Sequence, residues 1–357
     1  MNDDASKSRD RNHPPLIDEA VALRTATLVA PHYRGNPAQV AQLRARIAAD
    51  VAAADDSARD WTGLGTDLPP TRVRVVSRTG WVQANLIGLR GAFDPLAERL
   101  AGRQVAARFV GWQVGTLLGL LSTKVLGQYI LPLGGPGQAQ LVLVGPNLLE
   151  LSRRLGPLAD DVRRVVLVHE LAHRLQFDGV PWLGDHLRGL LGRYLESARL
   201  DPGAVLEALS RLPDALRALR EERSITPLLQ AVLSEEQRAV VDEAQALMSL
   251  LEGHGNATMY SAARGFVRDP DRVREALERR HSDFFGRLLT AVAGLDLKRR
   301  QYRDGEAFVR TVVGRVGTAG LNAAFNDPGS LPTLDEISAP ETWLARVHGE
   351  TVERSLE

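Results

Sequence analysis

The 357-residue sequence contains no cysteine, which excludes disulfides, thiolate nucleophiles, cysteine-ligated zinc fingers and iron–sulfur clusters. A cysteine-free chain of this size fits a reducing compartment. Residues 1–15 are polar and lack the apolar stretch of a secretory signal, and we predict that they form a disordered tail. These absences lead us to expect a cytoplasmic protein.

Lysine, net charge and long apolar runs are also scarce. Three lysines stand among 44 basic residues, and these balance 44 acidic ones, so the overall charge favours neither nucleic acid nor an acidic membrane surface. The most apolar stretch, residues 114–121, is too short to span a bilayer and predicts a buried helix. The arginines are scattered among carboxylates, without a basic aromatic platform for RNA. We therefore expect neither nucleic-acid nor membrane partners.

The chain does contain what a folded core needs, with 44% hydrophobic and 25% charged residues. Helical periodicity covers residues 16–30 and 37–55, then 80–127 with a break near 91–94. It returns after Pro146, whereas residues 56–70 are typical of a loop. The pattern predicts a mainly α fold.

The clearest β signal is a hairpin. Residues 128–133 and 140–144 flank a Gly-Gly-Pro-Gly turn, and residues 71–78 are expected to complete a small sheet. The segment 140–144 is either an edge strand along which an extended peptide could pair, or a sheet member packed on helices.

Three glycines recur at a four-residue spacing within the predicted helix 80–127. Gly111, Gly115 and Gly119 would lie on one helix face. Because glycine costs helix stability, such a row predicts very close backbone packing against a neighbouring helix.

Residues 165–175 carry the motif His-Glu-x-x-His, which a chain of this composition would contain about 0.01 times by chance. On a helix, His169 and His173 share one face, so both imidazoles can reach one metal ion. Glu170 lies about 100° round the helix, beside the metal rather than on it, where a general base for a water molecule belongs. Because this helix is apolar, three polar side chains in it need partners, which zinc would supply. The alternative is a hydrogen-bonded histidine pair, with Glu170 in a salt bridge.

A third ligand must come from elsewhere, because Gly179 stands where a metzincin would have histidine. The best candidate is Glu252, with His254 and His186 as alternatives. In an unbroken helix, residues two apart point about 200° away from each other. Glu252 would then face the metal and His254 would face solvent or a groove wall, whereas a break at Gly253 would let His254 turn inward. Glu252 could instead be a plain helix-terminal carboxylate.

Small and polar neighbours of Glu252 suggest supporting roles. Gly253 and Gly255 would let this helix approach the histidine helix closely. Asn256, one turn after Glu252, could orient a histidine ligand. Tyr260 is a candidate proton donor to a tetrahedral oxyanion, as are His254 and Tyr302.

These motifs carry a resemblance that extends over residues 16–348. The segment His169–Phe177, the sequence VPWL at 180–183, MSLLEGH at 248–254, QYRDGEAF at 301–308 and the stretch 331–337 resemble zincin-like hydrolases of actinobacteria and chloroflexi. Some members of that family are named for an association with deazaflavin coenzyme biosynthesis.

The resemblance implies a zincin-like metallopeptidase fold in one domain, residues 16–357. Its parts would be a helical region 16–127, the hairpin 128–145 and a metal-site region 146–357. It also implies that His169 and His173 are zinc ligands, Glu170 the base and Glu252 a gluzincin-like third ligand. Asn256 departs from the gluzincin pattern, which has aspartate there.

We therefore predict a zinc-dependent hydrolase, specifically an intracellular metallopeptidase acting on a peptide or small-molecule substrate. The alternative is a non-catalytic helical scaffold or regulatory protein that keeps the fold.

Overall fold

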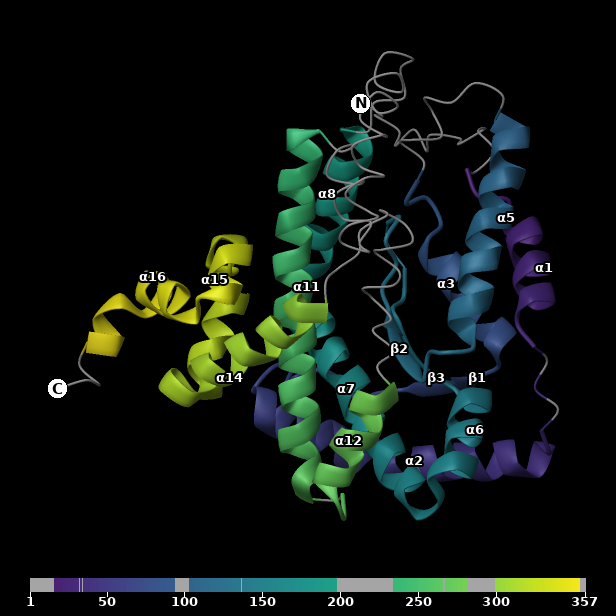
Figure 1. Ribbon diagram of the computed structural model, residues 1–357, viewed down its shortest axis with the longest axis horizontal. Helices are drawn as coiled ribbons and strands as arrows, with labels where there is room; N and C mark the ends of the chain where they lie inside the picture. The colour runs from purple at the N-terminus through teal and green to yellow at the C-terminus, as the bar shows by residue number, and fades with distance from the viewer. Residues whose placement is uncertain are drawn as a thin grey trace, which may run out of the picture.

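The computed structural model describes residues 16–93, 103–197, 234–280 and 299–353, except 32, 34, 136 and 266. The predicted disordered tail, residues 1–15, lies outside them. Within these residues no helix combines the length and the apolar character that a bilayer crossing requires. The predicted mainly α fold with a small sheet is confirmed (Figure 1).

The helices fall into two groups along the chain. The N-terminal helices are α1 (Glu19–Val29), α2 (Pro37–Thr62), α3 (Arg78–Gly88), α5 (Arg103–Ser122), α6 (Gly145–Leu155), α7 (Ala159–Gly179) and α8 (Leu183–Glu196). The C-terminal helices are α11 (Glu235–Ala262), α12 (Pro270–Arg280), α14 (Arg299–Leu321), α15 (Leu334–Ser338) and α16 (Pro340–Glu353).

The sheet has three strands in the order β1 (Val73–Val76), β3 (Gln140–Val144) and β2 (Gly127–Ile130). β3 pairs parallel with β1 and antiparallel with β2. The hairpin and the strand near residues 71–78 are therefore confirmed. Because β3 is the inner strand, the edge-strand interpretation of residues 140–144 is wrong. β2 is an edge strand instead, and it lies beside α7.

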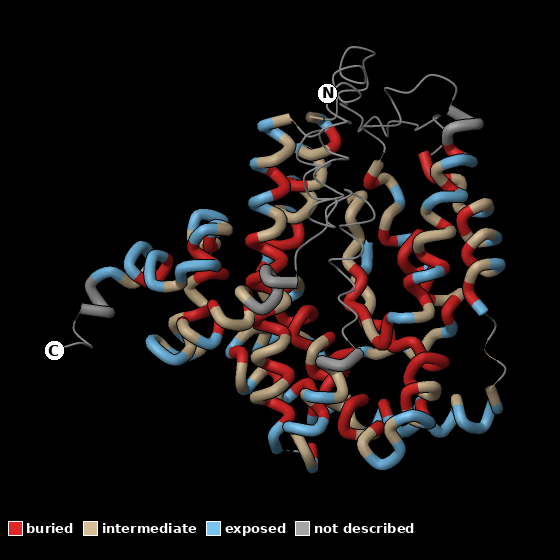
Figure 2. Tube along the Cα trace, in the orientation of Figure 1, coloured by how far each residue is buried: buried red, intermediate tan, exposed pale blue. Residues whose placement is uncertain are grey.

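Helices cover both faces of this sheet. Leu141 and Leu143 of β3 join a core with α2 and α7, whereas Val142 and Val144 join a core with α1, α3 and α5. This division follows from the alternation of side chains along a strand. Figure 2 shows buried residues running through the sheet into the helices on either side of it. The sheet thus separates the helix of the His-Glu-x-x-His motif from the layer formed by α1, α3 and α5.

The row of glycines on α5 lies against α1, as predicted. A Cβ atom added to Gly115 would lie 2.3 Å from the backbone oxygen of Ala22, and one added to Gly111 would lie 2.5 Å from that of Asp18. Gly119 faces the next turn of α1 in the same way. Only glycine permits backbones this close.

α2 is longer than predicted. It begins at Pro37 with the Asn36 side chain as its cap, but it continues through residues 56–62, where we expected a loop. Ala58 and Thr62 are buried and extend the apolar face, and the helix ends at Gly63 in the left-handed conformation, with φ of 66°.

α7 and α11 are the two central helices. α7 is buried on nearly every side, and α11 packs along it and against α14 (Figure 1). α11 begins with a capping box at Ser234 and runs without a break through Gly253, which excludes a helix end at that glycine. Gly253 itself faces α14, since an added Cβ would lie 2.4 Å from the Gly305 carbonyl oxygen.

Candidate metal centre

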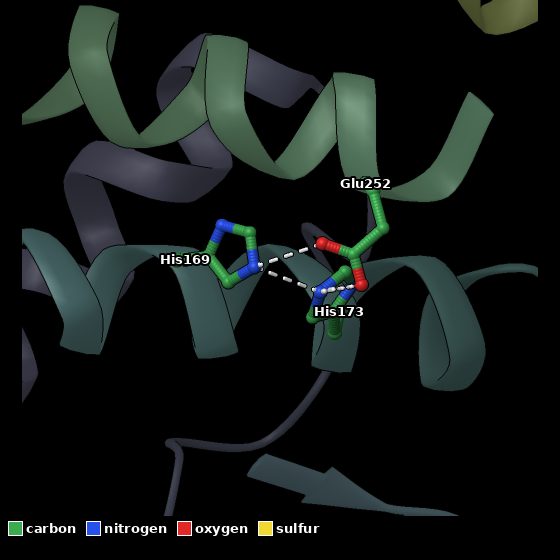
Figure 3. A group of neighbouring side chains, drawn as sticks. All are labelled: His169, His173 and Glu252. Atoms are coloured by element: carbon green, nitrogen blue, oxygen red, sulfur yellow. Dashed lines mark hydrogen bonds and ion pairs between the residues drawn. The ribbon is translucent and has the colours of Figure 1, made fainter. Parts of the chain in front are cut away.

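Three of the predicted site residues meet where α7 and α11 cross. Figure 3 shows His169 and His173 on α7 pointing toward Glu252, which reaches down from α11. The two histidine Nε2 atoms are 3.1 Å apart. The Oε2 atom of Glu252 lies 3.4 Å from Nε2 of His169, and its Oε1 atom lies 3.7 Å from Nε2 of His173. Among the described residues, these three form the one cluster whose donor atoms could hold a metal ion together.

The spacing of these donor atoms fits a tetrahedral ion. Ligands about 2.0–2.1 Å from such an ion lie about 3.3–3.4 Å from one another. The 3.1 Å between the two Nε2 atoms and the 3.4 Å between Nε2 of His169 and Oε2 of Glu252 are close to that value. Two imidazoles and one carboxylate are donor types that zinc accepts, and three protein ligands leave a fourth position open. The residues present therefore fit a zinc ion.

Local structure explains why these side chains converge. A spacing of four residues places His169 and His173 on one face of α7. Gly255 of α11 lies against both rings, because a Cβ added there would be 3.1 Å from Cε1 of His169 and 3.3 Å from Cε1 of His173. The predicted close approach of the two helices is thus found at Gly255, whereas Gly253 serves the contact with α14.

Burial and mutual contact perturb all three groups. Burial lowers the pKa of His173. Burial also opposes charge on His169 and on Glu252, but their contact outweighs it, so the pKa of His169 is raised and that of Glu252 is lowered. The Gly255 backbone carbonyl contributes to the rise in the pKa of His169, although the buried Nδ1 atom makes no hydrogen bond of normal geometry with the described residues. The cluster is mostly enclosed, and His169 keeps 17% of its side chain exposed.

Glu170 stands beside the three-residue cluster and is held by β2. Its Oε2 atom accepts a 3.0 Å hydrogen bond from the backbone N–H of Tyr129. Gly127 makes room for it, since an added Cβ would lie 2.7 Å from the Cγ atom of Glu170. Burial raises the pKa of Glu170 to about 7. This carboxyl group can therefore exchange a proton near neutral pH.

The prediction that His254 faces solvent or a groove wall is wrong. His254 is 1% exposed and lies between the rings of Trp61 and Phe325, with centroids 5.6 and 5.5 Å away. Burial lowers its pKa to about 3. Its Nδ1 atom lies 2.8 Å from the side-chain nitrogen of Gln176. His254 is not part of the metal cluster, and distant parts of the chain cover it.

Tyr260 and His186 are not part of the cluster of three. Tyr260 is two turns beyond Glu252 on α11, and the Arg274 guanidinium lies 4.8 Å from the centre of its ring. His186 stands on α8 against Trp182. The side chain of Tyr302 lies outside the described residues.

Gln176, rather than Asn256, forms a hydrogen bond with the second nitrogen of His173. Its Oε1 atom lies 2.9 Å from Nδ1. The sequence contains a signal for this contact, because Gln176 is an uncharged polar residue on an apolar helix, three positions after His173. Gly127 had no comparable signal, since its contact with Glu170 depends on how β2 packs on α7.

A family model for zincin-like metallopeptidases matches residues 17–344. The chain belongs to this family. A search of the curated proteins finds no match to this sequence. Its structure is similar to the crystal structure of a "putative hydrolase with a novel fold" from Chloroflexus aurantiacus, with 29% identity and a TM-score of 0.70. That similarity covers 92% of this zincin-like chain and 98% of the other, so it extends over most of both chains.

Proposed function

We propose that this protein is a zinc-dependent hydrolase, with His169, His173 and Glu252 as metal ligands and Glu170 as general base. The observation that carries the proposal is the convergence of two histidine Nε2 atoms and the Glu252 carboxylate at 3.1–3.7 Å, with the second carboxylate, Glu170, beside them. Membership of the zincin-like family and the similarity to a protein described as a hydrolase support it.

When bound, zinc would act as a Lewis acid and lower the pKa of a water molecule. The protein's own contribution is to place a base and to enclose the reaction. The Tyr129 N–H occupies Oε2 of Glu170, which leaves Oε1 to take the proton of the attacking water. Glu170 can then deliver that proton to the leaving group, an amine in the case of a peptide.

The position of β2 favours a peptide substrate. β2 is an edge strand in the described sheet, and the contact between Tyr129 and Glu170 turns its outer edge toward the site. An extended peptide could add to such an edge through backbone groups other than the Tyr129 N–H, which Glu170 already uses. We therefore propose a metallopeptidase, with a small-molecule amide as the alternative substrate.

Metal analysis and a peptide-library assay test the proposal. We expect about one zinc per chain, cleavage that stops with a chelator and returns with zinc, and no zinc in His173→Ala. Glu170→Gln should keep zinc but lower kcat about 10²–10⁴-fold, while Glu236→Gln, an exposed change on α11, should leave kcat unchanged. Full zinc occupancy in His173→Ala would refute the ligand assignment. Zinc bound by a fourth protein ligand, without cleavage, would indicate a structural site in a non-catalytic scaffold.

A further inference from the structure

Gln176 contacts both helices that supply the metal cluster, α7 and α11. It lies on α7, three residues after His173, and is fully buried. Its side-chain amide lies 2.9 Å from Nδ1 of His173, 3.1 Å from the backbone oxygen of Leu251 and 2.8 Å from Nδ1 of His254. A buried amide with three partners must orient in the one way that satisfies them.

The Leu251 carbonyl determines that orientation. A backbone carbonyl can only accept, so the atom of Gln176 that faces it is the amide nitrogen, which donates. The amide oxygen therefore faces His173, and an amide oxygen can only accept. His173 must then donate from Nδ1. The flipped amide would place two carbonyl oxygens 3.1 Å apart without a proton between them.

This orientation selects one tautomer of His173. With its proton on Nδ1, the neutral ring carries a bare lone pair on Nε2, the atom that faces His169 and Glu252. The opposite tautomer would direct an N–H into the cluster. The same amide nitrogen donates to Nδ1 of His254, which places the proton of that neutral ring on its Nε2 atom.

The amide also joins the two helices that supply the ligands. Leu251 immediately precedes Glu252, so the hydrogen bond from α7 to its carbonyl holds the α11 backbone beside the carboxylate ligand. Partners of this kind typically change metal affinity about 10–100-fold.

From these contacts we infer that Gln176 is a positioning residue for the metal centre: it holds His173 as the Nδ1–H tautomer, so that Nε2 is ready to bind zinc. This inference rests on the proposed zinc site, but the tautomer itself can be measured without zinc.

Two measurements on the whole protein test the inference. In metal-free wild-type protein, long-range ¹H–¹⁵N correlation spectra should show His173 protonated at Nδ1, with the signal identified by its loss in His173→Ala. Zinc affinity, measured by competition with a chromophoric chelator, should fall about 10–100-fold in Gln176→Met. Gln176→Glu keeps an acceptor for Nδ1 and should bind zinc more tightly than Gln176→Met.

Gln128→Met is the matched control. Gln128 is also buried, and its amide pairs with that of Asn85 on the opposite side of the sheet from α7. It should lose stability without losing zinc affinity. Equal zinc affinity in Gln176→Met and wild type, equal losses in Gln176→Met and Gln128→Met, or an Nε2–H tautomer at His173 would each overturn the inference. A wild-type protein that binds no zinc yet keeps the Nδ1–H tautomer would refute the proposed function while leaving the positioning contact intact.

Discussion

Gly127 and Gly255 each leave room for a side chain of the site that any larger residue would displace. They act on different groups, since Gly127 lies against Glu170 and Gly255 lies against the two histidine rings. The two glycines therefore offer a way to separate metal binding from proton transfer, using the same substitution at both positions.

We expect Gly127→Ala to leave zinc affinity unchanged and to lower hydrolysis, because the added Cβ meets the Glu170 side chain at 2.7 Å. Gly255→Ala should weaken zinc binding, because its Cβ would press on both imidazoles at 3.1–3.3 Å. Chelator competition and turnover of an identified substrate measure the two effects. Gly189→Ala on α8, where an added Cβ meets nothing within 4 Å, is the control and should change neither. Loss of zinc in Gly127→Ala alone would contradict this division.

At the same scale, the sequence predicts the candidate metal ligands better than the residues that form hydrogen bonds with those ligands. Helix geometry alone places His169 and His173 on one face of α7. It also makes Glu252 and His254, two residues apart on α11, point about 200° away from each other. The partner of the His173 Nδ1 atom depends on which side chains the tertiary packing brings within reach. Gln176 and Asn256 are both close in sequence to a ligand, and helix geometry alone does not choose between them.

At the scale of elements, the contact between α1 and α5 is fixed by small residues. We expect Gly115→Ala to lower the free energy of unfolding by about 1–3 kcal/mol, because its Cβ would lie 2.3 Å from the Ala22 carbonyl oxygen. Urea unfolding measures this change. Gly192→Ala on α8 is the control, since its Cβ has open space and alanine favours a helix by about 0.5–1 kcal/mol. If Gly115→Ala raised the free energy of unfolding as Gly192→Ala does, the backbones of α1 and α5 would have to move apart at little cost, which would contradict this prediction.

The short helix α15 depends on an ion pair that should respond to pH. The hydrogen bond from Arg346 lowers the pKa of Glu336, whose side chain also closes the capping box at Thr333. Because the folded pKa is depressed, this stabilisation is present above the unfolded pKa of about 4.3 and is lost as pH falls through the folded value. Glu336→Gln should therefore lower the free energy of unfolding at pH 7, with a smaller difference at pH 3. Glu341→Gln, in an exposed pair with Arg315, is the control and should have little effect at either pH. An equal loss at both pH values for Glu336→Gln would contradict the ionic contribution.

Element types were predictable, whereas some boundaries and the strand order were not. The close packing at the glycine row of α5 and the hairpin could be predicted, because each depends on the local spacing of residues. The extra turns of α2 were missed because a segment that ends in Pro69-Pro70 is typical of a loop, whereas the burial of Ala58 and Thr62 depends on the tertiary packing. The inner position of β3 depends on its pairing with β1, more than 60 residues away, which no local pattern encodes.

At the scale of the whole molecule, the metal cluster lies between two hydrophobic cores. Buried residues of α7 belong to the core that also contains α2 and one sheet face. The α11 residues just before Glu252, among them Leu247 and Leu251, belong to a core with α8, α14, α15 and α16. α11 already connects the two cores, because its residues Met259 and Ala262 belong to the first one. An ion held by His169, His173 and Glu252 would add a second link between them.

Zinc should consequently stabilise the folded protein as a whole. A ligand that binds only the folded state adds about 2.7 kcal/mol at a free concentration of 100 times its Kd. We expect a rise of several degrees in Tm when zinc is added to chelator-treated protein, and no rise in His173→Ala. Magnesium is the matched ion, because it prefers octahedral oxygen ligands and should leave Tm unchanged. Calorimetry with and without each ion measures the effect. An equal rise in His173→Ala would place the stabilising zinc away from the crossing of α7 and α11.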